Sequence, residues 1–211
     1  GINKNNIKFI SNQEADENSI KKALKIWLTG FNKPNQSDIY LFFAGHGFAD
    51  SDGKELYLLP FDGDPRLLSE TAIQRSYIFD IVKSLQPKSA TVFLDACYSG
   101  ETREKEMILA NTRRIVPVAL ENDVPENFTI FSASSGSETS SSLPEASHGL
   151  FSYFLMKGLE GDADINKDKK ITSEELHSYV RDRVSKQAAR LGVIQTPQLQ
   201  GDENRVLVEF N

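Results

Sequence analysis

The sequence predicts an α/β domain with a mostly parallel sheet flanked by helices on both faces. Apolar stretches of strand length, such as 39–44 and 91–94, contain almost no polar residues, as is typical of strands buried on both faces of a parallel sheet. Stretches with apolar residues at helical spacing lie between these strands, and this alternation favours parallel pairing. We expect a single domain over residues 1–211, a length that buries about 70% of the unfolded surface.

Each element has its own signal in the chain. The predicted strands, which are short apolar runs bounded by turn residues, are Ile7–Ile10, 39–47, Leu56–Pro60, 91–97, Phe128–Ala133 and Arg205–Phe210. The predicted helices, which carry an apolar stripe on one face, are Glu17–Leu28, Thr71–Leu85, Gly149–Leu159 and Ser173–Leu191. The polar stretch Glu101–Asn127 predicts an exposed loop with a short edge strand at Ile115–Leu120.

Composition excludes several functional classes. The net charge of −6 argues against a nucleic-acid partner. No apolar run approaches the roughly 18 residues that would span a membrane, and no signal-peptide pattern is visible. The single cysteine cannot form an internal disulfide and is compatible with a reducing compartment. We therefore expect a cytoplasmic protein that binds neither nucleic acid nor membranes.

Two predicted strands end in residues suited to nucleophilic catalysis. One ends in Gly45-His46-Gly47, and the other ends at Cys97, the only cysteine. Carboxyl ends of parallel strands meet at the edge where open α/β sheets bind ligands, so a thiol and an imidazole would come together there as nucleophile and base. Taken separately, a lone cysteine is more often a buried apolar residue and a histidine between glycines can cap a turn. Their joint occurrence on two such strands favours catalysis.

The other two histidines have different surroundings. His148 is also followed by glycine, but it precedes a helical pattern and is predicted to start that helix. His177 lies within the last predicted helix, with no nucleophile near it in the sequence.

The spacing of the two motifs resembles that of the caspase-like cysteine peptidases (peptidase C14). Cys97 follows His46 by 51 residues, and caspases have their histidine about 50 residues before the cysteine. Residues 95–100 read Asp-Ala-Cys-Tyr-Ser-Gly, which is similar to the D-x-C-x-S-G of metacaspases and bacterial orthocaspases. The resemblance spans nearly the whole chain. It implies the caspase-like (caspase–hemoglobinase) fold and a cysteine endopeptidase that acts through a thioester intermediate, with a Cys97–His46 dyad and the backbone N–H groups of Gly47 and Cys97 as oxyanion donors.

Asp95 is the expected specificity residue. Residues two apart in a strand share a face, so Asp95 lies beside Cys97. Caspases have glutamine at this position and bind aspartate, whereas a carboxylate would pair with Arg or Lys in a protein or peptide substrate. The resemblance also places Ser132–Ser135 along the pocket wall. The alternative is that Asp95 only satisfies nearby backbone donors.

A second cluster of oxygen ligands follows the predicted helix at 149–159. Asp164, Asn166, Asp168 and Glu175 occupy positions 1, 3, 5 and 12 of a calcium-loop pattern. Lys169 stands where that pattern has glycine. The competing interpretation is that Thr172 and Glu175 form a capping box for the last helix. Calcium is thus an optional cofactor, and the peptidase chemistry itself requires none.

The resemblance also raises expectations beyond the active site. The family has a strand-helix unit before the part that matches Ile7, and its strand lies inside the sheet, so we expect this chain to lack that unit and to associate with its own N-terminal fragment. We also expect self-cleavage in Glu101–Asn127, after Arg103, Lys105, Arg113 or Arg114.

Two functions of different classes follow from these observations. The first is a cysteine endopeptidase that cleaves after Arg or Lys. The second is a catalytically silent caspase-like module that binds a partner protein and responds to calcium. Retention of both His46 and Cys97 favours the enzyme.

Overall fold

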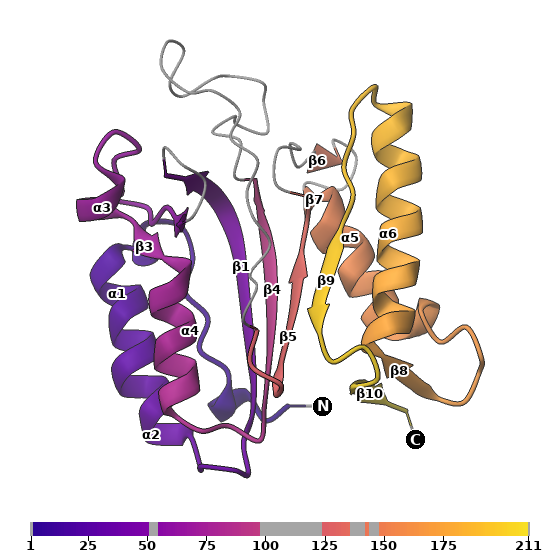
Figure 1. The fold of residues 1–211 in the computed structure, drawn as a ribbon, viewed down its shortest axis with the longest axis horizontal. Helices are drawn as coiled ribbons and strands as arrows, with labels where there is room; N and C mark the ends of the chain where they lie inside the picture. The colour runs from indigo at the N-terminus through magenta and orange to yellow at the C-terminus, as the bar shows by residue number, and fades with distance from the viewer. Residues whose placement is uncertain (1, 51–54, 98–123, 136–141, 144–147, 211) are drawn as a thin grey trace.

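The computed structural model describes residues 2–50, 55–97, 124–135, 142–143 and 148–210. Within these residues, six strands form one mixed sheet in the order β3-β2-β1-β4-β5-β9 (Figure 1). The three central strands, β1 (Asp38–Ala49), β4 (Ser89–Cys97) and β5 (Phe128–Ser132), are parallel. The outer strands, β2 (Leu56–Leu58), β3 (Ile73–Gln74) and β9 (Gln198–Gly201), pair antiparallel. The predicted parallel sheet is therefore found at the centre, and its edges are antiparallel.

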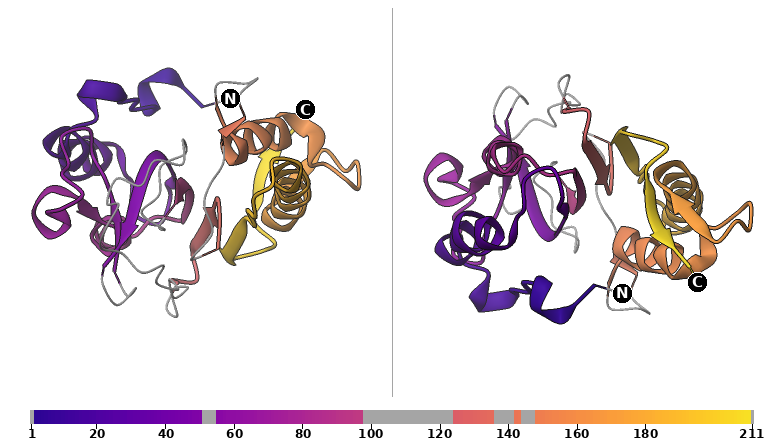
Figure 2. Two further views of the ribbon diagram at one scale, coloured as in Figure 1. Left: turned by 90° about the horizontal axis from the view of Figure 1, so that it is seen from above. Right: turned by 90° about the horizontal axis from the view of Figure 1, so that it is seen from below.

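Helices cover both faces of this sheet, as predicted (Figure 2). One face packs against α4 (Arg75–Ser84) and against a continuous helical segment made of α1 (Glu17–Lys22), η3 (Ala23–Leu28) and α2 (Thr29–Phe31). The other face packs against α5 (Leu150–Lys157), which continues as η4 (Gly158–Asp162), and against α6 (Ser173–Arg190). The remaining short elements are η1 (Lys4–Asn6), η2 (Asn12–Glu14), α3 (Leu68–Thr71) and two small antiparallel pairs, β6 (Ser142–Leu143) with β7 (His148–Gly149) and β8 (Lys170–Thr172) with β10 (Val206–Glu209).

The central strands are apolar because they contribute to two separate cores. In β4, Val92 and Leu94 pack into the core under α1 and α4, whereas Phe93 packs into the core under α5 and α6. The ring of Phe93 stacks on that of Phe131 with centroids 5.1 Å apart. Side chains alternate between faces along a strand, so a strand covered on both faces needs apolar residues at successive positions.

Strand β1 is covered less completely than β4 and β5. Ile39 is buried, but Tyr40 and Phe42 on the opposite face are 43% and 57% exposed, and the described part of the second core contains no residue of β1. β2 pairs with β1 at Gly47–Ala49 and the N–H of Leu59 reaches the His46 carbonyl, so among the described strands residues 38–45 of β1 pair with β4 alone. The expectation that the chain lacks a strand-helix unit of the family stays a prediction.

Three sequence-based boundaries need correction. Ile7–Ile10 is not a strand: Ile7 and Phe9 are exposed, and no described strand pairs with the segment. The helix predicted from Thr71 begins at Arg75 because Ile73–Gln74 pair with β2 as β3. Residues 206–209 do form a strand, but they pair with β8, and the polar Gln198–Gly201 supplies the last strand of the sheet instead.

Other expectations fall on parts of the chain that the structure does not describe. The proposed self-cleavage positions and the edge strand at Ile115–Leu120 lie outside the described residues. Within the described ones, no helix combines the length and the apolar character needed to cross a bilayer.

The junction of β9 with β5 gives a stability prediction. Gly201 has φ +97°, and a Cβ there would overlap the carbonyl of Phe128. We expect Gly201→Ala to lower the free energy of unfolding by about 2 kcal/mol or more, because both backbone strain and overlap with backbone atoms oppose it. Urea denaturation measures the change.

The matched control is Gly192→Ala. Gly192 also has a positive φ, +74°, but its Cβ would meet nothing within 4 Å. At this position backbone strain alone should lower the free energy of unfolding by about 1 kcal/mol. If both variants lowered the free energy of unfolding equally, the proposed overlap at Gly201 would be contradicted.

Candidate active site

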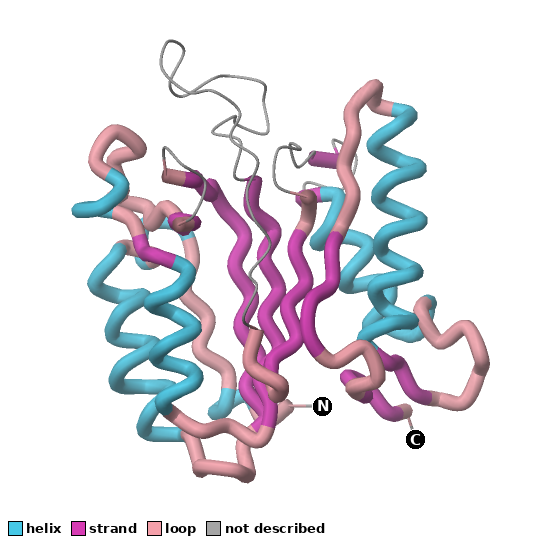
Figure 3. The backbone as a smooth tube through the Cα atoms, viewed as in Figure 1, coloured by secondary structure: helices cyan, strands magenta, loops and turns pink. Residues whose placement is uncertain are grey.

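The parallel ladder between β1 and β4 ends at the two residues that sequence reasoning selected. Its register runs without a break from Asp38 opposite Ser89 to His46 opposite Cys97. Neighbouring strands lie about 4.8 Å apart, so the backbones of His46 and Cys97 are adjacent at the end of this ladder. Figure 3 shows the central strands running side by side toward that edge. The His46 side chain is exposed. The structure thus brings the predicted pair to one edge of the sheet.

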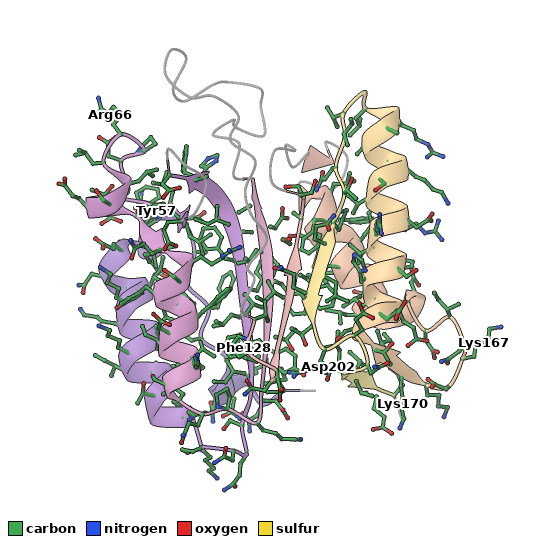
Figure 4. All side chains as sticks on the ribbon, viewed as in Figure 1. Tyr57, Arg66, Phe128, Lys167, Lys170 and Asp202 are labelled. Atoms are coloured by element: carbon green, nitrogen blue, oxygen red, sulfur yellow. The ribbon has the colours of Figure 1, made fainter. Side chains whose placement is uncertain are left out.

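The backbone of His46 is held on both sides. On one side it pairs with β4, and on the other its carbonyl accepts a hydrogen bond of 2.9 Å from the N–H of Leu59. Beyond His46, β1 continues into Gly47 and the buried Phe48, which packs with Leu68 and with Tyr57, the residue labelled in Figure 4. His46 therefore lies where β1 ends its pairing with β4 and is secured by β2.

Asp95 lies on β4, two residues before Cys97, and is fully buried. Its Oδ2 accepts hydrogen bonds from the Ser152 hydroxyl and, at 3.3 Å, from the Ser152 backbone N–H in the first turn of α5. A Cβ on Gly149 would overlap the same carboxylate, so the absence of a side chain there permits the close approach. The carboxylate therefore does accept from a backbone donor, as the alternative interpretation required. Its role in specificity stays a prediction.

The segment after β5 is anchored by a residue that sequence reasoning missed. Ala133 donates its N–H to the Leu94 carbonyl at 2.9 Å and accepts from the Gln195 side chain at 3.1 Å. Gln195 is 1% exposed, and its own carbonyl accepts from the Ser185 hydroxyl of α6. Within the predicted pocket wall Ser132–Ser135, Ser134 is buried. Gln195 belongs to no periodic pattern, so nothing in the sequence indicated its burial.

His177 lies in the helix that was predicted for it, whereas His148, which was predicted to start a helix, lies in the short strand β7. The backbone of His148 pairs with Leu143, and α5 begins two residues later. His177 is in α6, with Nε2 at 3.1 Å from the carbonyl oxygen of Pro197. Of the three, His46 is the one on a strand paired with the Cys97 strand.

The acidic loop lies at the other end of the molecule from this edge, as the positions of Lys167 and Lys170 show in Figure 4. The side-chain oxygens of this loop accept hydrogen bonds from backbone N–H groups of the same loop. Asp164 accepts from the N–H of Lys169 at 3.1 Å, and Asp168 accepts from the N–H of Lys170 at 2.8 Å. Asn166 likewise accepts from the N–H of Asp168 at 2.8 Å. Lys169 makes the sharp turn with φ +67°, in place of the expected glycine.

Glu175 is engaged differently from the other three predicted ligands. Its Oε2 accepts from the N–H and hydroxyl of Thr172, while the Thr172 hydroxyl accepts from the Glu175 N–H, which confirms the capping box. In the part of the chain that the structure describes, no group of three or more His, Cys, Asp or Glu residues is placed to hold a metal ion. Calcium binding by Asp164, Asn166, Asp168 and Glu175 remains a prediction.

Comparisons with known proteins agree with this architecture. The family model of the caspase domain (peptidase C14) matches residues 5–208. Solved structures with a similar fold include the crystal structure of caspase-1 from Spodoptera frugiperda, with a TM-score of 0.55 and 15% sequence identity over 92% of this chain and 70% of that chain. A search of curated proteins finds no significant match.

At so low a sequence identity, the structural match establishes only the fold. Membership of the family rests on the family-model match. The family match covers nearly the whole chain, including both strands that end in the predicted dyad and the strands and helices that position them. The chain belongs to the caspase-domain family of cysteine peptidases, peptidase C14.

Proposed function

We propose that this chain is a cysteine endopeptidase that cleaves peptide bonds after Arg or Lys with a Cys97–His46 dyad. The observation that carries the proposal is the register of β1 and β4, whose last pair is His46 and Cys97. An imidazole beside a thiol favours the thiolate, which is the nucleophilic form. Support for a cysteine peptidase in general comes from the family match.

The reaction follows from these residues in two halves. In acylation, the Cys97 sulfur attacks the carbonyl carbon before the scissile bond, and the thiol proton passes through His46 to the leaving amine. The backbone N–H groups of Gly47 and Cys97 stabilise the oxyanion of the tetrahedral intermediate. In deacylation, water attacks the thioester with His46 as base, which releases the carboxylate product and regenerates the thiol.

The specificity for basic side chains rests on Asp95. A carboxylate two residues before the nucleophile attracts a guanidinium or ammonium group and repels the aspartate that caspases prefer. Asp95 is 0% exposed, so a substrate side chain reaches it only after the residues that cover it rearrange. Ser152 already holds Oδ2, so substrate recognition by this carboxylate has to coexist with that anchor.

The first prediction concerns the dyad. Cys97→Ala should abolish peptide cleavage, and His46→Ala should lower kcat by several orders of magnitude, because activation of the thiol and protonation of the leaving amine are lost together. Fluorogenic peptides with Arg before the scissile bond measure both effects. His148→Gln is the control and should retain activity. A wild type that folds but cleaves no peptide would favour the silent binding module instead.

Self-cleavage belongs to the same proposal. Arg103, Lys105, Arg113 and Arg114 are side chains that an Asp95 pocket would accept. Wild type incubated beside Cys97→Ala should alone produce fragments that begin at Glu104, Glu106, Arg114 or Ile115. Equal persistence of both proteins, under conditions where wild type cleaves peptides, would contradict it.

The second prediction concerns specificity. Asp95→Asn should weaken transition-state binding of Arg peptides by about 2–4 kcal/mol, because a buried charge pair with the substrate is lost. The matched control is Asp80→Asn, which removes the same charge from an exposed position on α4. The ratio of kcat/KM for Arg and Gln peptides measures the effect. A wild type that prefers Asp or an apolar residue before the scissile bond would refute the pocket.

The third prediction concerns calcium, which we propose as a structural ligand of the loop at 164–175. The loop gathers hard oxygen donors, and Lys169 already has the turn that such a loop needs. Binding requires Glu175 to turn from its cap toward the ion. Glu175→Gln keeps a side chain suited to the capping box but removes the charge. Calcium should raise the Tm of wild type and leave that of Glu175→Gln unchanged. A wild-type Tm that does not respond to calcium would exclude the site.

A further inference from the structure

Asp95 is held in place by the start of α5. Ser152, the third residue of that helix, donates both its hydroxyl and its backbone N–H to the single oxygen Oδ2 of Asp95. Ser152 is itself 8% exposed and Asp95 is 0% exposed, so both partners lie within the protein. The first backbone N–H groups of a helix have no hydrogen-bond partner within the helix. A carboxylate can accept from them and is also stabilised by the positive end of the helix dipole.

The contact depends on a close approach of helix and strand. A Cβ on Gly149 would lie 3.0 Å from the Asp95 Cγ and would overlap Oδ2, so another residue at 149 would push α5 away from β4. The neighbour of Asp95 on β1 is Ala44, which is exposed and has only a methyl side chain. The carboxylate is therefore fixed from the side of α5 and flanked by a small residue on the side of β1.

We infer that Ser152 is the positioning residue for substrate specificity, because it sets the orientation of the Asp95 carboxylate before substrate arrives. This inference rests on the proposed function, in which Asp95 binds the basic side chain of the substrate. The two bonds from Ser152 restrict rotation of the carboxylate, so the guanidinium of the substrate meets an acceptor that is already oriented. Without the hydroxyl, the carboxylate loses the shorter of its two bonds to Ser152 and turns more freely.

The test compares two peptides that differ only in Arg or its neutral analogue citrulline before the scissile bond. Ser152→Ala should raise KM for the Arg peptide about tenfold, the factor for loss of one charge-assisted hydrogen bond. Its kcat should stay within about twofold of wild type, and its KM for the citrulline peptide should be unchanged. Ser152→Thr keeps a hydroxyl and should restore the low KM.

The matched control is Ser173→Ala. Ser173 is also a buried serine at the start of a helix, but its hydroxyl donates to the Arg205 carbonyl, away from Asp95. A purely structural role for Ser152 would lower the Tm of both variants without changing the ratio of the two KM values. If Ser152→Ala does not fold, Ser152→Cys replaces it in the comparison of the two peptides. The cysteine side chain is similar in size to serine but is only a weak hydrogen-bond donor.

Two results overturn the inference in different ways. If wild type prefers Arg and Ser152→Ala shows the same preference, the inference alone is wrong. If wild type cleaves both peptides equally or neither, the proposed specificity of Asp95 is wrong and the inference falls with it.

Discussion

The register between β1 and β4 is the constraint on which the rest of this structure depends. Nine consecutive residue pairs join the two strands, from Asp38 with Ser89 to His46 with Cys97. A shift of one residue would move every side chain of a strand to the opposite face of the sheet, so that Val92 and Phe93 would each have to fit the core that now holds the other. Packing of Val92 and Phe93 into separate cores therefore also fixes the positions of His46 and Cys97. The stability of the fold and the geometry of the candidate dyad have the same physical cause.

The contact between β4 and α5 links this central ladder to the second half of the chain. Asp95 faces away from the first core, and its carboxylate is satisfied by Ser152 instead of by water. A fully buried carboxylate without such donors would be strongly unfavourable. The same bonds that make its burial tolerable also orient it, so Asp95 has both a structural and a proposed recognition role. Our specificity proposal requires these two roles to coexist.

Much of this fold was predictable because its signals are local. Continuous apolar runs indicated β1, β4 and β5, and the capping box of Thr172 and Glu175 indicated the start of α6. The strand expected at Ile7–Ile10 was wrong because an apolar segment becomes a strand only where another strand can pair with it. Strand β9 was missed because Gln198–Gly201 is polar and is determined by pairing with β5 across a long sequence separation.

The candidate site was predictable to a similar extent. Its two main residues follow apolar strands, so their meeting at one edge could be derived from the parallel arrangement. The partners of Asp95 and Ala133 could not be derived, because Ser152 and Gln195 reach them only through the packing of α5 and of the segment after α6. Hydrogen bonds between elements distant in sequence leave no periodic signal in either element.

Covalent labelling of the active site tests the central claim most directly. A peptide chloromethyl ketone that ends in arginine alkylates a thiol much faster when its side chain is bound and the thiol is activated. The account predicts one adduct per chain, located by mass spectrometry at Cys97, formed much more slowly with the citrulline analogue and strongly reduced in His46→Ala. An unmodified Cys97 in folded wild type, or labelling at the same rate in wild type and His46→Ala, would contradict it.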